Sequence, residues 1–177
     1  GGIEMALGGG TYLVQNKVLP GAYINFVSRP RAMGSLGERG VVCVGMEMNW
    51  GAAGMVTVEA AEFRTDSRKL FGYDYLSEEM KDLRELFLHA KKVKIYRGKG
   101  GEQAKAEMDG LTVTAKYTGA RGNDICVAIV ENVDEEGYFD VETYLGTEMV
   151  DTQSAATAEE LKNNDFVTFS GGGALTV

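Results

Sequence analysis

The segment from Gly8 to Phe26 constrains the fold most. It is unlike a helix, and it cannot easily bury its apolar residues in a core of its own. It opens on three consecutive glycines, shows no helical spacing of apolar residues, and alternates apolar with polar residues on either side of Pro20-Gly21. An extended segment with a flexible root either forms an edge strand or adds its free N–H and C=O groups to another sheet. The sequence therefore predicts an N-terminal arm and first strand over residues 5–26, which points to assembly. Residues 1–4 are interpreted as a remnant of cloning.

Composition narrows the class of protein. The chain has 177 residues, 44% hydrophobic and 25% charged, which is typical of a globular protein with one or two cores. A net charge of −8 argues against a nucleic-acid interface, which needs basic surface. No apolar run reaches the ~20 residues of a membrane span, and no secretion signal opens the chain, so we expect a cytoplasmic product. Cys43 and Cys126 lie in apolar runs and are expected to be buried, free thiols.

Residues 27–98 predict a partial α+β core domain. The apolar run Val41–Met46 is expected to be a fully buried strand, and Met55–Val58 a second strand. A short helix over Ser67–Phe71, capped by Thr65 or Asp66, should end at Gly72.

A second helix is predicted to begin at the N-cap Ser77 and to end near Lys91-Lys92. Its apolar residues recur at three- and four-residue spacings, which predicts one buried stripe. The stripe comprises Met80, Leu83, Leu86, Phe87 and Ala90. Alternation over Val93–Arg97 then predicts a strand.

Residues 99–177 predict a small, mostly antiparallel β-sandwich or barrel of five or six strands, so the fold class of the chain is α+β. The polar, flexible segment Gly98–Gly101 is the expected boundary. The expected strands are Leu111–Tyr117, a central strand Ile125–Val130, Phe139–Leu145, a hairpin partner Glu148–Asp151 after the turn Gly146-Thr147, and Phe166–Phe169. A short helix is expected from Thr157 to about Asn163. The chain stops at Val177 without a terminator, so we expect this domain to be truncated.

The sequence does not predict an enzyme, a metal site or a cofactor. The single histidine, His89, is interpreted as a structural residue at a helix end. Gly98–Gly101 lacks the Gly-Lys-Ser/Thr of a phosphate-binding loop, and Asp134–Glu136 lacks the spacing of a calcium loop and is expected to form a solvated turn. Trp50 and the tyrosines at 73 and 75 are interpreted as packing aromatics.

Several stretches, in their order and spacing, resemble the tail sheath proteins of contractile phage tails, in particular those of Gram-positive phages and prophages. They are Gln15–Phe26, Lys69–Tyr75, Leu111–Tyr117 with Gly119 and Arg121–Ile125, Phe139–Leu145, and Asn163–Gly171. The resemblance runs from Met5 over nearly the whole chain. It implies a structural subunit that stacks as hexameric rings around an inner tube and contracts, without nucleotide, to drive the tube through a cell envelope.

The resemblance also implies binding partners and a cellular location for the subunit. Partners would be other sheath subunits, and an inner tube and baseplate bound through regions outside this chain, with no nucleic acid and no membrane. The subunit would assemble in the bacterial cytoplasm and then reside in a virion tail or a released bacteriocin-like particle. The subunit-linking arm would comprise Leu7, Thr11, Tyr12, Leu13, Val14, Gln15, Asn16, Lys17, Val18 and Leu19. Residues 99–177 would correspond to an outward-facing insertion. The alternative hypothesis is a monomeric β-sandwich module that binds a cell-surface or carbohydrate ligand.

Overall fold

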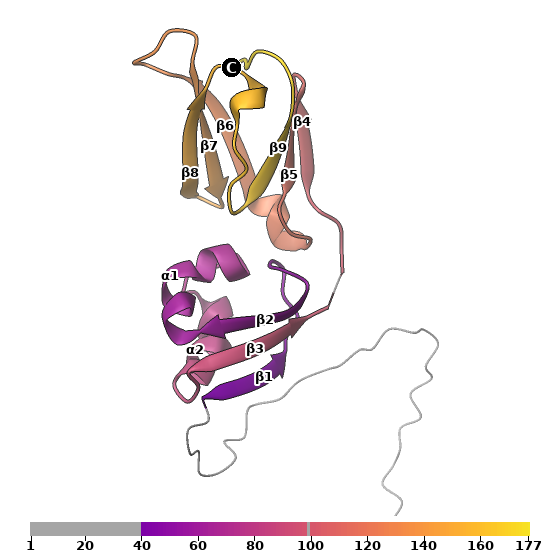
Figure 1. Ribbon diagram of the computed structural model, residues 1–177, viewed down its shortest axis with the longest axis vertical. Coiled ribbons are helices and arrows are strands. Elements are labelled where there is room, and N and C mark those ends of the chain that lie inside the picture. The colour runs from indigo at the N-terminus through magenta and orange to yellow at the C-terminus, as the bar shows by residue number, and fades with distance from the viewer. Residues whose placement is uncertain (1–39, 99) are drawn as a thin grey trace, which may run out of the picture.

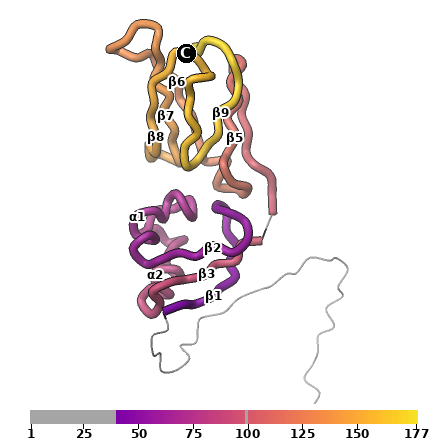
Figure 2. The backbone as a smooth tube through the Cα atoms, viewed as in Figure 1, coloured from indigo at the N-terminus to yellow at the C-terminus, as the bar shows by residue number. Residues whose placement is uncertain are grey.

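The computed structural model describes residues 40–98 and 100–177, which form two units stacked along the long axis of the molecule (Figure 1). The lower unit contains a small sheet with its helices, and the upper unit is a β-sandwich. The chain passes from the lower unit to the upper one between strand β3 (Lys92–Arg97) and strand β4 (Lys105–Met108) (Figure 2). The predicted arm, including every arm residue named above, lies outside the described residues.

The sheet of the lower unit has three strands in the order β1-β3-β2. They are β1 (Val41–Gly45), β2 (Gly54–Glu59) and β3 (Lys92–Arg97). β3 is parallel to β1 and antiparallel to β2. The prediction that Val41–Met46 is fully buried is wrong, because β1 is an edge strand with one face open and Cys43 is exposed on that face.

Two helical segments cover the other face of this sheet. Helix α1 spans Ala60–Phe71, so it begins earlier than predicted, at a capping box between Glu59 and Glu62. It ends where predicted, at Gly72 in the left-handed conformation. The second helix is a 3-10 turn, η1 (Glu78–Met80), continued by α2 (Lys81–Phe87). It therefore ends earlier than the predicted end near Lys91-Lys92, and Lys92 already belongs to strand β3.

The core of the lower unit lies between these helices and the sheet. The predicted stripe is confirmed: its five residues all contribute, with Met80, Leu83 and Ala90 buried and the other two partly buried. They pack with Val58, Phe63, Phe71, Val93 and Ile95.

The upper unit is a sandwich of two three-stranded antiparallel sheets, which confirms the predicted fold class. One sheet has the order β4-β5-β9 and the other β6-β7-β8. The strands are β4 (Lys105–Met108), β5 (Leu111–Ala115), β6 (Ile125–Glu131), β7 (Phe139–Leu145), β8 (Glu148–Ala155) and β9 (Val167–Gly171). A 3-10 turn, η2 (Ala120–Asp124), precedes β6. Leu111, Val141, Ala155, Leu161 and Leu175 form the core between the sheets.

Two details of the sandwich differ from prediction. β6 is an edge strand, not a central one, and Cys126 on its outer face is exposed rather than buried. The helix expected from Thr157 is a single 3-10 turn, η3 (Ala158–Glu160), because Leu161 already has an extended backbone. The hairpin at Gly146-Thr147 is confirmed, since Leu145 pairs with Glu148.

Candidate assembly junction between the two units

Trp50 fixes the lower unit to the base of the sandwich. It lies between β1 and β2, is fully buried, and packs with Ala115, Leu145, Phe166 and Val167 of the upper unit. Its ring meets Tyr117 edge-on with 5.2 Å between centroids, and stacks on Phe166 at 6.1 Å. The indole Nε1 donates to the carbonyl of Lys69 at 3.1 Å. Trp50 is therefore a packing residue, as predicted, and presents no exposed platform for a sugar or a base.

Arg97, the last residue of β3, is the second residue that holds this junction. Its guanidinium is buried and donates to the carbonyls of Met48 at 3.3 Å, Gly51 at 2.8 Å and Thr118 at 2.5 Å. Burial lowers the pKa of Arg97, yet an arginine remains charged at neutral pH. All of its hydrogen-bond acceptors are backbone carbonyls or the Thr118 hydroxyl, so the group works as a clamp between two loops.

Arg121, in η2, makes the third connection. It donates from Nε to the carbonyl of Gly72 at 2.8 Å, pairs with Asp124 at 2.8 Å, and lies over the ring of Tyr73 at 4.5 Å. Gly72 has a φ of +79°, and a Cβ there would lie 2.9 Å from side-chain atoms of both Arg121 and Trp50. The close approach of the two units therefore depends on glycine at this position.

Ion pairs surround this buried contact at the surface. Arg68 lies 3.6 Å from Glu148, and Lys69 lies 3.9 Å from Asp165. Such exposed pairs contribute little on their own. The contacts of the buried Trp50 and Arg97 and of the partly buried Arg121 are what join the two units.

The best-formed hollows among the described residues are small. Two small hollows hold about 10 and 30 Å³, the room of one or two water molecules, whereas ligand pockets hold roughly 300–1,000 Å³. Residues 40–98 and 100–177 contain no group of three or more His, Cys, Asp or Glu side chains placed to hold a metal ion. His89 is exposed in the turn after α2. The Asp134–Glu136 segment is an exposed turn between β6 and β7, as predicted.

None of the helices in residues 40–98 and 100–177 is long and apolar enough to cross a membrane.

Sequence reasoning missed Arg97 and Arg121. A signal for Arg97 was present, because in a strand with alternating faces it shares the buried face of Val93 and Ile95. An arginine at such a position predicts a satisfied guanidinium in the interior. Arg121 gave no comparable signal, since its partners across the junction are 49 residues away at Gly72 and in the adjacent ring of Tyr73.

The comparisons with known proteins agree with this geometry. Residues 99–177 match the family model of the phage tail sheath protein beta-sandwich domain. The chain belongs to the phage tail sheath family. The sheath tail protein of Desulfitobacterium hafniense shares 41% sequence identity and a TM-score of 0.72 over 88% of this chain and 36% of its own. That of Listeria innocua shares 34% and a TM-score of 0.68 over 81% of this chain and 32% of its own.

The chain is also similar to a curated protein of Bacillus subtilis. The phage-like element PBSX protein XkdK of Bacillus subtilis is 37% identical over 173 residues, which are 96% of this chain and 36% of that protein. The chain thus spans little more than a third of the length of the curated relatives it matches.

Proposed function

We propose that this chain is part of a structural subunit of a contractile tail sheath, in a phage or a phage-derived bacteriocin particle. The observation that carries the proposal is the 41% identity and shared fold with a sheath tail protein across 88% of the chain. In this proposal the subunits stack as hexameric rings around an inner tube, assemble in the bacterial cytoplasm, and contract to drive the tube through an envelope. The segment Leu7–Leu19 links neighbouring subunits by adding strands to their sheets.

The physical character of the described residues supports a mechanical role. A subunit of a moving lattice must transmit displacement without deforming. The buried Trp50 and Arg97 and the partly buried Arg121 join the sandwich to the lower unit through packed side chains and short hydrogen bonds. The two small hollows give no support to a ligand-binding module. The proposal requires no nucleotide, metal or cofactor.

Negative-stain electron microscopy tests the proposal directly. The complete gene product and the 177-residue chain would be imaged side by side at tens of micromolar. Hollow cylinders from the complete product, and none from the 177-residue chain, are expected. Monodisperse globules from both would contradict the proposal and favour a monomeric binding module. Deleting residues 7–19 from the complete product should abolish cylinders while leaving its circular dichroism spectrum unchanged.

A further inference from the structure

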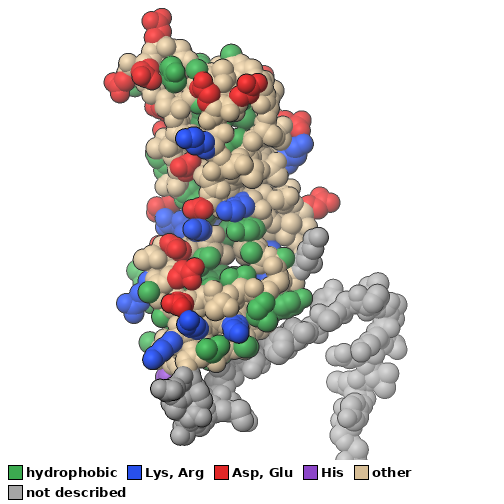
Figure 3. Space-filling view, in the orientation of Figure 1, with side chains coloured by type: hydrophobic (Ala, Val, Ile, Leu, Met, Phe, Trp, Pro, Cys, Tyr) green, Lys and Arg blue, Asp and Glu red, His purple; other side chains and the backbone are tan. Residues whose placement is uncertain are grey.

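In the part of the chain that the structure describes, one face of the lower sheet is exposed and is here called the open face. The strand register places three rows on this open face: Val41, Lys92 and Glu59; Cys43, Lys94 and Thr57; and Gly45, Tyr96 and Met55. The helices pack on the opposite face, where Val93 and Ile95 are buried. Green and blue side chains gather over β1 to β3 in the lower half of Figure 3.

This open face carries three exposed large apolar residues. Val41, Met55 and Tyr96 are 52%, 60% and 54% exposed. Met55 and Tyr96 are paired neighbours on β2 and β3, whereas Val41 lies two rows away. Adjacent exposed apolar residues such as Met55 and Tyr96 are a feature of protein interfaces. The charges among them are Lys94, and Lys92 paired with Glu59 at 2.8 Å, so the open face is net positive.

The charge of the chain is unevenly distributed. Residues 40–98 carry nine acidic and nine basic side chains, whereas residues 99–177 carry fifteen acidic and five basic ones. The sandwich therefore has a net charge of −10. Red side chains are prominent at the sandwich end of the molecule in Figure 3.

The loop of residues 132–138 between β6 and β7, here called the acidic tip, combines charge with an apolar group. Asp134, Glu135 and Glu136 are exposed, and Val133 is 97% exposed. Asn132 holds the acidic tip in shape by accepting the backbone N–H groups of residues 134 and 135 at 2.8 Å.

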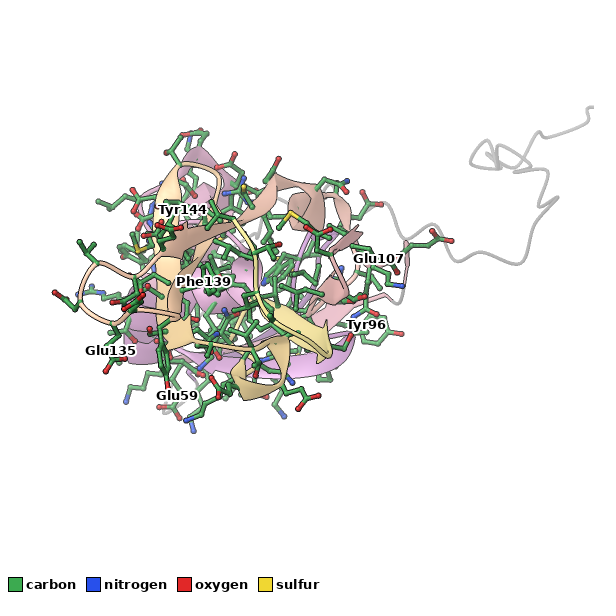
Figure 4. All side chains as sticks on the ribbon, turned by 90° about the horizontal axis from the view of Figure 1, so that it is seen from above. Glu59, Tyr96, Glu107, Glu135, Phe139 and Tyr144 are labelled. Carbon is green, nitrogen blue, oxygen red and sulfur yellow. The ribbon has the colours of Figure 1, made fainter. Side chains whose placement is uncertain are left out.

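We propose that the open face of one copy binds the acidic tip of a second copy. Lys94 and Lys92 would face the tip carboxylates, and Tyr96 and Met55 would cover Val133. Figure 4 shows Glu135 and Tyr96 on opposite sides of the molecule, so this contact joins two molecules. Such a head-to-tail contact between different patches generates a ring when its rotation closes and an open polar stack when it does not. The inference rests on the proposed function and supplies one contact of its lattice.

The contact is small, and it should be weak between free subunits. Specific stable interfaces bury about 800 Å² per partner, more than one loop on a three-stranded sheet provides. Within a lattice other contacts hold the copies close, and a high effective concentration then lets a weak contact form.

Cys43 provides the test, because it lies on the open face beside Lys94 and is exposed. The labelling rate of Cys43 is measured in the Cys126→Ser variant of the complete gene product. We expect maleimide to label Cys43 roughly tenfold more slowly in assembled cylinders than in the monomer. The labelling rate of Cys126 is measured in the Cys43→Ser variant, and it should be the same in both states because Cys126 lies on the outer face of β6.

Charge reversal tests the partner. Lys94→Glu should weaken Cys43 protection by roughly fivefold, given the magnitude of exposed ion pairs. Glu135→Lys with Glu136→Lys should have a similar effect, and combining the three should restore protection. Lys162→Glu, a reversal at an exposed lysine of the sandwich that belongs to neither surface, is the matched control.

The outcomes separate the inference from the function. If the wild-type product forms no cylinders, the proposed function itself fails. Cylinders in which Cys43 labels as fast as in the monomer would overturn this inference alone. Protection of Cys43 already in the monomer would assign the open face to another part of the same polypeptide, and would equally overturn it.

Discussion

Replacing Arg97 by methionine should loosen the sandwich from the lower unit. Methionine keeps much of the side chain's apolar packing and removes every donor. The carbonyls of Gly51 and Thr118 then lose charge-assisted hydrogen bonds of 2.8 and 2.5 Å, each contributing about 1.5–3 kcal/mol. Relief of the buried guanidinium's desolvation offsets part of this loss. We expect the free energy of unfolding to fall by about 2–4 kcal/mol, and the Tm by roughly 5–15 °C.

The assay exploits the single tryptophan of the chain. Because Trp50 is buried at the junction, its fluorescence reports the contact between the units, whereas far-ultraviolet circular dichroism reports all strands and helices. In the wild type the two signals should change together during urea unfolding. In Arg97→Met the fluorescence transition should precede the circular dichroism transition.

Arg84→Met is the matched control. Arg84 also donates to two carbonyls, those of Tyr75 and Ser77, yet both partners lie within the lower unit. This variant should lose stability while its two signals remain coincident. If Arg97→Met stays within about 0.5 kcal/mol of the wild type, or keeps coincident transitions, the clamp described above does not hold the units together.

Three further changes test other parts of the structure. Gly119→Ala should lower the free energy of unfolding in urea by more than about 2 kcal/mol, because φ at this residue is +125° and an alanine Cβ would lie 2.2 Å from a backbone oxygen. The control Gly137→Ala, at a glycine with open space around it, should lower the free energy of unfolding by about 1–2 kcal/mol. Asn164→Ala should lower the unfolding free energy by about 2–3 kcal/mol, since Asn164 Oδ1 accepts two backbone N–H groups at 2.8 Å; an unchanged urea midpoint would contradict this. The hydrogen bond to the Glu142 carboxylate raises the pKa of Tyr144, so its stabilising effect is complete below pH ~10 and is lost as pH rises through the raised pKa. Glu142→Gln should lower that pKa, measured by absorbance at 295 nm against Tyr144→Phe.

The sequence predicted those local features whose physical cause lies in residues close together in the chain. The stripe of α2, the Gly72 terminus of α1 and the Gly146-Thr147 hairpin follow from spacing, from glycine's access to positive φ, and from a two-residue turn. Each of these depends on residues within about ten positions of one another.

The errors arose where the number of neighbouring strands decided the outcome. Both Val41–Gly45 and Ile125–Glu131 are apolar runs, yet both are edge strands and leave a cysteine exposed. An apolar run shows that charge is absent, but it does not show how many strands lie beside it. Sheet order depends on pairings such as β5 with β9, more than 50 residues apart, which no local pattern encodes.

The junction was the least predictable feature, because every contact in it joins distant segments. Trp50 meets Phe166 across 116 positions of sequence, and Arg121 reaches back 49 positions to Gly72. The hydrophobic pattern predicts each unit separately, since burial on one face of a helix or strand is a local property. Their attachment instead depends on single residues with unusual demands: a large indole whose N–H needs an acceptor, a guanidinium that needs several, and a glycine where no side chain fits. A residue type that is costly to bury, found at a position where the pattern requires burial, is therefore the sequence signal that distant segments must supply its partners. Those segments belong to the same unit for Lys69, which accepts from Trp50, and to the other unit for Thr118, which accepts from Arg97.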